Sequence, residues 1–498
     1  MTSKDRLDVQ KLRFRRQFLL GPRSVQEFAD WPSASVGHGL IVHAHPDLPL
    51  LQVTREPFRI TLLGYLIDPE EPDLDDHGVL STLMSRCSRA RDLPAAAAGL
   101  CGRFVIVADD GSDTVLFSDP CALRETFFVG ADFGETWCAS QPDRIADVHG
   151  LSCSDAAKRF MAGDYYQRHH EPWWPGGTTQ YSEVERLRAN HFLDLRTRIQ
   201  HRFWPNRHLE HWDLETAAQR CAEILRGLMT AAHKRFPLAL PLTSGWDSRT
   251  ILAASRGMDD IWHYTAHRAG LTGRSADMRI PPRLLQKLGR KHTVIKCPPR
   301  MSAPFANLYR MNTFPAHDAA GAIAEGLLGA FPEGRVSVSG HCSEIVRDTS
   351  QVPYWPPPGA EELAADISMD GDPYAIELFG RWLEETSPTV EKFGYHIWEF
   401  FSWEQEYATW AANGQGQWDL LHERLTPFNS RVLLDVMTGV DLPLRQGPDY
   451  PIFTRIMQIL WPDVLSEPIN PRHKSLAARI RARAGSIRRR ITQAAEQA

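Results

Sequence analysis

The most regular hydrophobic pattern of the chain runs from Pro237 to Gly257, with the sequence PLALPLTSGWDSRTILAASRG. Alternating leucines from Leu238 to Leu242 indicate a short buried β-strand. Small residues at Thr243 to Gly245 indicate a tight turn, and Asp247 to Ala254 have the composition of a buried helix with an acidic first turn. This stretch therefore predicts a strand, a turn and a helix in direct succession.

Further apolar runs follow this segment along the chain. Asp260 to Ala266 and Lys291 to Cys297 have the composition of strands, and a helical pattern from Ala276 to Leu288 separates them. Arg335 to Gly340 is another β-like run, and it ends in Ser-Gly. Strands that alternate with helices predict an α/β fold with a parallel, doubly wound sheet, in which ligands bind at the carboxyl ends of the strands.

The patterns outside this region divide the chain into two large parts. Asp213 precedes an amphipathic helix that begins the C-terminal part, and beyond Glu344 the chain becomes helical and aromatic. Short β-like runs fill the N-terminal third, the first of them at Leu12 to Leu20. We therefore predict an N-terminal domain at residues 1–165, a linker at 166–205, and a C-terminal domain with a helical lobe at 206–498.

The predicted turn between strand and helix has the chemistry of a phosphate-binding loop. Backbone N–H groups at a helix N-terminus attract anionic oxygens, and the turn lacks the Gly-Lys-Ser/Thr ending that holds a transferring γ-phosphoryl group. An aspartate takes that place, and a carboxylate among phosphates requires a divalent cation between them. We therefore expect ATP and Mg²⁺ as ligands, Asp247 as a metal ligand, and five cofactor-binding residues in the loop: Thr243, Ser244, Gly245, Asp247 and Ser248.

These residues resemble the motif of the pyrophosphate-loop (PP-loop) ATPases. The family motif is Ser-Gly-Gly-x-Asp-Ser, and Thr243 to Ser248 match it as Thr-Ser-Gly-Trp-Asp-Ser. Ser244 replaces the first glycine of the motif, and its side chain would be strained if the position required a positive φ. The resemblance implies a loop that holds pyrophosphate while the α-phosphate of ATP reacts.

The run that ends at Gly340 resembles a second loop, found in the asparagine synthetase branch of this family. There a strand ends in Ser-Gly-x-Gly-x-Asp-Glu, and the acidic residues help to bind the metal and pyrophosphate. In this chain the loop is one residue shorter, so Glu344 stands for both acidic positions. The resemblance implies Gly340 as a cofactor-binding residue and Glu344 as a catalytic residue and metal ligand. Asp277 matches another acidic residue of the family, although an aspartate near a helix start is commonly a cap.

The similarity continues toward the end of the chain. Ile469 to Lys474 is similar to a late stretch of the family with Arg-x-Lys, which implies Lys474 as the catalytic cation on the reacting phosphate. Glu404 lies in the lobe that closes over the substrate in the family, so we expect it either in that pocket or on a solvated face. Arg249 is expected to matter less because its side chain can reorient, and Asp247 and Glu344 are expected in loops.

The N-terminal third is also similar to asparagine synthetase, whose first domain has a class II glutamine amidotransferase fold. Ile60 to Asp68, Leu100 to Val107 and Ser118 to Phe128 resemble successive strands and turns of that domain. The resemblance implies an Ntn-hydrolase-like αββα sandwich. Active members carry a cysteine nucleophile directly after the initiator methionine, whereas Thr2 follows Met1 here. We therefore expect a domain without glutaminase activity that supports the C-terminal half.

Composition and charge narrow the function further. The net charge of −5 argues against nucleic acid as a partner, and the eight cysteines form no C-x-x-C pair, which is typical of a cytoplasmic protein with reduced thiols. No apolar run approaches the roughly 18 residues of a spanning helix. From Lys474 to Ile491, apolar residues share one helical face among many arginines. This pattern permits a peripheral membrane contact, although a solvated terminal helix is the simpler interpretation.

Together these features predict an ATP-dependent ligase that forms an amide bond through an acyl-adenylate and releases AMP and pyrophosphate. The expected substrate is a small molecule or peptide with a carboxylate and an amine, with a protein partner of the same pathway as a further expectation. β-Lactam synthetases and lasso-peptide cyclases, which act by intramolecular cyclisation, share the plan with an inactive first domain. An ammonia-dependent asparagine synthetase and an inactive ATP-binding scaffold are the alternatives; the acidic balance disfavours a tRNA-modifying enzyme.

Overall fold

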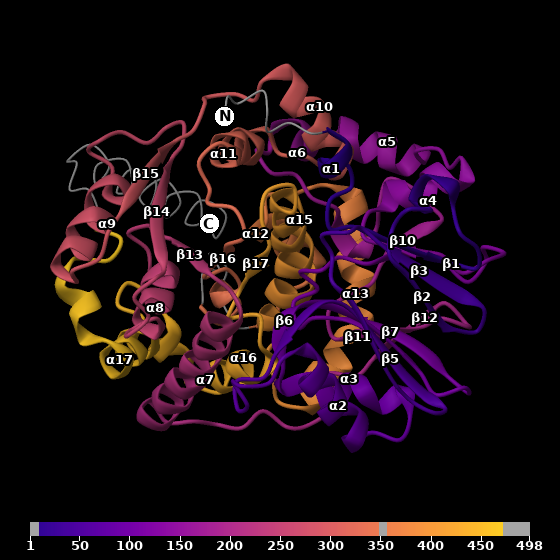
Figure 1. Cartoon of the computed structure of the whole chain (residues 1–498), viewed down its shortest axis with the longest axis horizontal. Helices are drawn as coiled ribbons and strands as arrows, with labels where there is room; N and C mark the ends of the chain where they lie inside the picture. The colour runs from indigo at the N-terminus through magenta and orange to yellow at the C-terminus, as the bar shows by residue number, and fades with distance from the viewer. Residues whose placement is uncertain (1–8, 348–355, 472–498) are drawn as a thin grey trace, which may run out of the picture.

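A computed structural model of the chain describes residues 9–347 and 356–471. Figure 1 shows two antiparallel sheets of the N-terminal half at the right of the view and the parallel sheet of the C-terminal half at the left. Helices of the C-terminal lobe, among them α13 (Pro373–Lys392) and α15 (Ala412–Trp418), lie between them. In the described part of the chain, no helix has both the length and the apolar character needed to cross a membrane.

The N-terminal half contains two six-stranded sheets. The first has the order β10-β8-β9-β1-β3-β2, and its strands are β1 (Phe18–Gly21), β2 (Ser33–Gly37), β3 (Leu40–Ala44), β8 (Phe127–Val129), β9 (Cys138–Ala139) and β10 (Val184–Arg186). The second has the order β12-β11-β7-β6-β5-β4, and its strands are β4 (Leu50–Arg55), β5 (Phe58–Ile67), β6 (Cys101–Asp109), β7 (Thr114–Ser118), β11 (His191–Asp194) and β12 (Ile199–Arg202). Every pairing within the two sheets is antiparallel in the described residues.

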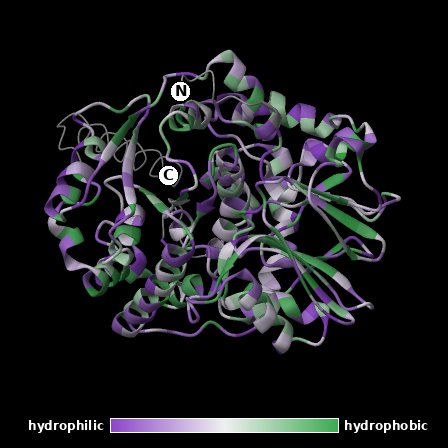
Figure 2. Cartoon of the chain, in the orientation of Figure 1, coloured by the Kyte–Doolittle hydropathy of each residue, from purple (hydrophilic) through white to green (hydrophobic). Residues whose placement is uncertain are grey.

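Three apolar clusters show that these sheets form the middle of four layers. Side chains of both sheets, such as Leu20 and Val105, pack together between them. The outer face of the second sheet packs on α2 (Asp76–Arg86) and α3 (Leu93–Ala96), and the outer face of the first sheet packs on α4 (Pro142–His149). The hydrophobic colouring of the central strands in Figure 2 follows this burial. The expected order of layers, helix, sheet, sheet, helix, is therefore present.

The segment 166–205, which we expected to be a linker, completes the N-terminal sheets instead. It contributes β10 to the first sheet and β11 and β12 to the second. The short runs VER and IQHR carry few apolar residues, and no residue of IQHR is fully buried, so they lack a strong hydrophobic signal. The first strand is also shorter than expected: Leu12 ends the helix α1 (Val9–Leu12), and β1 begins at Phe18.

The C-terminal half is built around a five-stranded sheet with the order β15-β14-β13-β16-β17, and all its pairings are parallel in the described residues. The strands are β13 (Leu238–Pro241), β14 (Trp262–His267), β15 (Thr293–Lys296), β16 (Val336–Val338) and β17 (Arg424–Leu425). From β13 the chain moves outward to β14 and β15, then returns to β16 on the other side of β13. This reversal is the switch point at which doubly wound sheets bind ligands, and the expected α/β sheet is confirmed.

Helices cover this sheet and form the C-terminal lobe. Asp213 caps the long helix α7 as expected, since its carboxylate accepts hydrogen bonds from the N–H groups of Glu215 and Thr216, both at 3.0 Å. The described helices not yet given are α5 (Asp155–Ala162), α6 (Asp164–Arg168), α7 (Leu214–Arg235), α8 (Trp246–Ala254), α9 (Ala276–Lys287), α10 (Ala303–Asn312), α11 (Asp318–Leu328), α12 (Ala360–Asp366), α14 (Ile397–Phe401), a π-helix (Ser402–Ala411), α16 (Arg431–Thr438) and α17 (Pro451–Leu460). The largest apolar cluster joins α7, the parallel sheet and this lobe in one core.

Candidate functional site

The loop between β13 and α8 is held by hydrogen bonds among its own hydroxyl groups. The Oγ of Ser248 accepts from the Thr243 N–H at 3.2 Å and lies 3.0 Å from Thr243 Oγ1. Thr243 Oγ1 in turn accepts from the Gly245 N–H at 3.1 Å. These bonds stabilise the turn and direct the chain into the first turn of α8.

Ser244 and Asp277 connect this loop to the next helix of the sheet. The Ser244 N–H and Oγ donate to Asp277 Oδ1 at 2.8 and 2.7 Å, and Asp277 lies in the first turn of α9. The backbone of Ser244 has no positive φ, so the replacement of the motif glycine causes no left-handed strain. The serine hydroxyl adds a second bond to Asp277, which a glycine could not make.

The N-terminus of α8 is left open by the residue that precedes it. Gly245 is the N-cap, and within the described residues no side chain caps this end of the helix. The first-turn N–H groups of a helix have no partner within the helix, and the helix dipole favours negative charge beside them. The end of α8 can therefore receive anionic oxygens, as a phosphate-binding loop requires.

Gly340 brings the second loop against this helix. A Cβ at Gly340 would lie 2.6 Å from the Cβ and 2.9 Å from the carbonyl oxygen of Asp247, so a side chain at this position would prevent the contact. The close approach places Asp247 next to the 3₁₀ turn Ser343–Val346, which contains Glu344. Asp247 lies in the first turn of α8, so neither carboxylate lies in an irregular loop, contrary to our expectation.

An arginine that the motif comparison did not predict joins these two carboxylates. Arg347 Nη2 lies 2.9 Å from Asp247 Oδ1 and 3.0 Å from Glu344 Oε1, and the Ser343 hydroxyl donates to Asp247. The arginine is 9% exposed, whereas the two carboxylates are 26% and 25% exposed and face the cleft. One cation thus faces two anions. Its position three residues after Glu344 is a helical spacing that a sequence search for ion pairs would find.

The electrostatics of this cluster favour an additional cation. Burial and the neighbouring Asp247 carboxylate raise the pKa of Glu344 to about 8, against the opposing effect of Arg347. Among the described residues, Glu344 Oε2 is buried and has no hydrogen-bond partner. The same part of the chain holds no group of three or more histidine, cysteine, aspartate or glutamate side chains arranged for a metal. Mg²⁺ commonly takes one or two carboxylates together with phosphate oxygens, so these two residues fit it only alongside a nucleotide.

A cavity of about 320 Å³ lies over the carboxyl ends of β13, β14 and β16. Its lining contains apolar side chains, among them Leu242, Leu271 and Leu327, together with hydroxyl and carboxylate groups. Five of the predicted site residues line it: Thr243, Asp247, Ser248, Gly340 and Glu344. Ser244 and Gly245 lie beside it in the same loop. A cavity that has apolar side chains beside an anion-binding helix N-terminus suits a nucleotide, which joins an apolar base to phosphates.

Arg424 and His341 extend this wall, and neither was singled out from the sequence. Arg424 begins β17, a strand of two residues that is too short to show any periodicity. His341 follows Gly340, and burial together with the nearby Arg424 charge lowers the pKa of His341 to about 3, which keeps the imidazole neutral. Both residues lie at the switch point and face the cleft.

Arg249, which we expected to reorient, and Glu404, which we expected in the pocket or on a solvated face, have structural roles instead. Arg249 is fully buried and donates to the carbonyl oxygens of Val464, Glu467 and Pro468 at 2.7, 2.9 and 3.3 Å, so it does not reorient. Glu404 is 1% exposed and accepts from Arg202, from Trp382 Nε1 at 3.0 Å and from Asn190 at 3.1 Å. It lies neither in the pocket nor on a solvated face. Thr2, Lys474 and the basic segment 474–491 lie outside the described residues.

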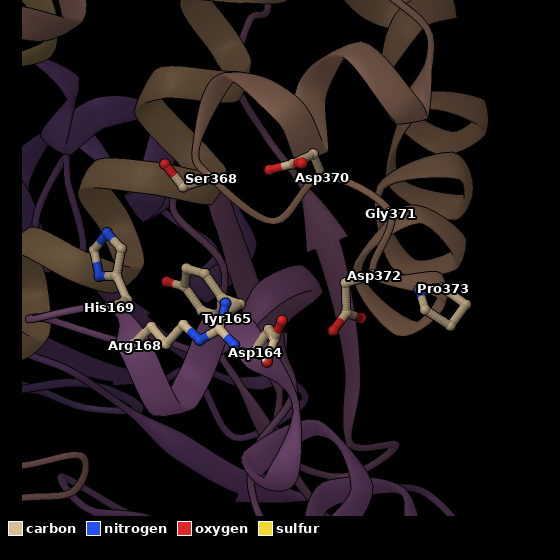
Figure 3. A pocket seen from close by; sticks show the side chains of 9 residues that line it. All are labelled: Asp164, Tyr165, Arg168, His169, Ser368, Asp370, Gly371, Asp372 and Pro373. Carbon is tan, nitrogen blue, oxygen red and sulfur yellow. Dashed lines mark ion pairs between the residues drawn. The ribbon is translucent and has the colours of Figure 1, made fainter.

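A larger hollow of about 590 Å³ lies away from the sheet, between α6 and the segment that precedes α13. Figure 3 shows Asp164 and Arg168 on one side and Asp370 and Asp372 on the other, with His169 beside Arg168. Arg168 pairs with Asp164 at 3.2 Å. The carboxylates of Asp370 and Asp372 on the other side have no arginine in the lining beyond Arg168 and would repel phosphates, so the hollow does not compete with the cleft as a nucleotide site.

Comparisons with known proteins do not assign this chain to a family. No family model matches it, and no curated protein matches it. Among solved structures, "the allosteric regulatory enzyme of purine biosynthesis" is similar at 12% identity and a TM-score of 0.26, over 61% of this chain and 74% of that one. Glutamine phosphoribosylpyrophosphate amidotransferase from B. subtilis, solved with ADP and GMP, is similar at 10% identity and a TM-score of 0.25, over 63% and 90%. TM-scores of this size do not establish a common fold.

Proposed function

We propose that this chain is an ATP-dependent ligase that forms an amide bond and releases AMP and pyrophosphate. The observation that supports the proposal is the cleft at the switch point, where an open helix N-terminus faces two carboxylates that share one arginine. A site for pyrophosphate needs anion-binding N–H groups and a cation-binding pair together. In this proposal Asp247 and Glu344 hold Mg²⁺, which supplies charge neutralisation for the departing pyrophosphate.

The proposed reaction has two steps. An oxygen of the substrate carboxylate attacks the α-phosphorus of ATP, the bond from that phosphorus to the bridging oxygen breaks, and pyrophosphate leaves with the electron pair. An amine then attacks the carbonyl carbon of the acyl-adenylate, loses a proton and displaces AMP. The protein residues act by position: the end of α8 binds phosphate oxygens, and Gly340 keeps Glu344 beside Asp247. Lys474 is retained as the proposed cation on the α-phosphate.

The N-terminal sandwich is proposed to be an amidotransferase-like domain that supplies no ammonia. Burial raises the pKa values of the Cys87, Cys101 and Cys138 thiols, which disfavours these three cysteines as nucleophiles. The amine would then be free ammonia or part of the substrate, as in an intramolecular cyclisation. A glutaminase assay on the purified protein is expected to give the background rate.

Product analysis tests the main proposal. ATP labelled at the α or γ position is incubated with the protein, Mg²⁺ and a panel of N-acetyl amino acids, with hydroxylamine as the amine. We expect labelled AMP and pyrophosphate in equal amounts, and a hydroxamate of the accepted acid. ADP and phosphate as products would contradict the proposal.

A catalytically inactive ATP-binding scaffold is the second candidate. Arg347 favours it, because this arginine already pairs with both carboxylates. A scaffold would bind ATP, measured by titration calorimetry, with an affinity that does not depend on Mg²⁺, and it would release no pyrophosphate. The ligase is expected to bind ATP more tightly when Mg²⁺ is present.

A further inference from the structure

A second cavity of about 340 Å³ adjoins the nucleotide cleft. The two cavities share lining residues at their junction: Arg268, Ile323, His341, Trp418 and Arg424. From this junction the second cavity extends along α15 toward Trp410 and Glu171, where Trp410 Nε1 donates to Glu171 Oε2 at 2.8 Å. Its volume lies at the lower end of the roughly 300–1,000 Å³ typical of small-molecule sites.

Arg424 stands at the junction as a buried cation without a counterion. It is 7% exposed, and its guanidinium makes no ion pair or hydrogen bond with any residue in 9–347 or 356–471. The guanidinium makes a cation–π contact with the Trp418 ring, whose centroid lies 5.3 Å from the guanidinium carbon. A buried charge without a partner is costly, so its presence at a cavity wall indicates an anionic ligand.

Other buried arginines of the chain show how unusual this is. Arg103 pairs with Asp419, with one bond of 2.8 Å, and Arg431 donates to Asn190 Oδ1 at 3.1 Å. Arg249 donates to three backbone carbonyl oxygens. Each of these side chains has acceptors within the fold, so each is explained by structure alone. Arg424 differs from them because its buried Nε has no acceptor within the described residues.

Gln415 supplies a second unsatisfied group in the same cavity. It is 1% exposed, lies on α15, and its Oε1 has no donor among the described residues. Gln417, two residues later, has both ends of its amide bonded: Oε1 accepts from Tyr309 and from the His317 N–H, and Nε2 lies 2.8 Å from His317 Nδ1. A buried carbonyl oxygen without a donor is expected to receive an N–H group from a ligand.

We propose that this second cavity binds the acid substrate as a single amino-acid unit, with its carboxylate on Arg424 and an N–H group on Gln415 Oε1. The apolar part of the unit packs against Trp410 and Trp418. Because Arg424 also lines the nucleotide cleft, a carboxylate on its guanidinium lies next to the bound nucleotide, where it would attack the α-phosphorus. This inference rests on the proposed ligase function for its chemistry, but the binding itself needs no nucleotide.

The test uses N-acetyl amino acids and their methyl esters as probes, with binding measured by saturation-transfer NMR on the full chain without ATP. We expect one or more acids to bind and the matching esters to fail, because an ester offers no anion to Arg424. Arg424→Gln is expected to weaken acid binding at least about tenfold, since a hydrogen bond to a charged group is lost. Arg424→Lys, which keeps the charge, is expected to retain weaker but acid-selective binding.

Gln415→Met tests the proposed contact between the ligand N–H group and Gln415 Oε1 independently of Arg424. It is expected to weaken the N-acetyl acid about fivefold and to leave the affinity of the corresponding acid without an N–H group unchanged, because only the former donates to Oε1. Arg431→Gln and Gln405→Met are matched controls, since both residues are 1% exposed, have partners within the fold and lie outside the cavity. Both controls should bind the acids as the parent does.

Equal binding of acids and esters, unchanged binding in Arg424→Gln, or binding by no acid of the panel would overturn the inference. The experiments distinguish a failure of this inference from a failure of the proposed ligase function. Formation of AMP and pyrophosphate together with Arg424-independent acid binding would contradict the cavity assignment alone. Acid binding that depends on Arg424, in a protein that makes no AMP, would contradict the ligase alone.

Discussion

Two clusters of charged side chains in this molecule use the same residue types with opposite results. In the first, at the boundary between the two halves, Arg103 and Arg124 face Asp419 and Glu423. In the second, in the cleft, Arg347 is the one cation among residues 9–347 and 356–471 that pairs with Asp247 and Glu344. The arginines around Glu423 lower its pKa to about 2, whereas burial and Asp247 raise the pKa of Glu344 to about 8.

The difference lies in charge balance and access. In the boundary cluster Arg103 donates to both carboxylates, at 2.8 Å to Asp419 Oδ2 and 3.1 Å to Glu423 Oε1, and the arginines are 3% and 1% exposed. Each anion has a cation, so the cluster is complete without a ligand. As far as the described residues go, the cleft cluster has one cation for two carboxylates and faces a cavity, which is the arrangement expected where a cation and an anionic substrate bind.

The largest effect is expected from Arg103→Met. Removing one partner of a buried ion pair leaves charge uncompensated, so the free energy of unfolding should fall by about 3–5 kcal/mol, measured by denaturant titration. Arg89→Met is the control, because Arg89 is 70% exposed and pairs only with Asp92; its loss should be below about 1 kcal/mol. Equal losses in both variants would show that the boundary cluster does not stabilise the fold.

Asp247→Ala should give the converse result. We expect the rate of AMP formation to fall at least about 10²-fold, because a charge-stabilising group next to the reacting phosphates is lost. The free energy of unfolding should stay the same or rise, since the variant relieves the repulsion with Glu344. Asp318→Ala, an exposed aspartate in the first turn of α11, is the control and should keep full activity. A stability loss as large as that of Arg103→Met would contradict a functional role for the cleft cluster.

Arg249→Met tests whether α8 carries a structural residue, Arg249, close to the proposed functional residue, Asp247. The loss of three hydrogen bonds to buried carbonyl oxygens should lower the free energy of unfolding by about 2 kcal/mol. Hydrogen exchange should show reduced protection at Asn470, whose N–H donates to the Ser244 carbonyl oxygen at 2.9 Å. Arg256→Met, an exposed position just after α8, should change neither measurement. An unchanged free energy of unfolding in Arg249→Met would contradict the structural role of Arg249 and would support a side chain that reorients freely.

A further prediction concerns the pH dependence that Glu423 contributes to stability. Its pKa is lower in the folded chain than the usual value of 4.5, so it stabilises the fold fully above pH 4.5 and loses this contribution as the pH falls toward about 2. Glu423→Gln should therefore flatten the acid limb of a plot of unfolding free energy against pH. Glu333→Gln, at an exposed position, should leave that limb unchanged. A parent curve that is already flat below pH 4.5 would contradict the assignment.

Local sequence was sufficient for the parts of the fold with strong patterns. The run from Leu238 to Ala254 was predicted as strand, turn and helix, and the structure has β13 and α8 there. Buried parallel strands have nearly continuous apolar runs, and a helix cap such as Asp213 bonds to N–H groups within one turn. Both features can therefore be predicted from residues that are close in sequence. The strands β10, β11, β12 and β17 were missed because they are short and partly polar.

By itself the sequence determined which residue types occur in the two loops and in what order, and these suffice to predict Asp247 and Glu344 as a pair. Only the tertiary structure decided how they are neutralised. Arg347 reaches both carboxylates because Gly340 allows the second loop to approach α8. β17 places Arg424 at the junction of two cavities, where its guanidinium has no acceptor within the described part of the chain. Electrostatic energies depend on distance and burial, and neither quantity is contained in the spacing of residues along a chain.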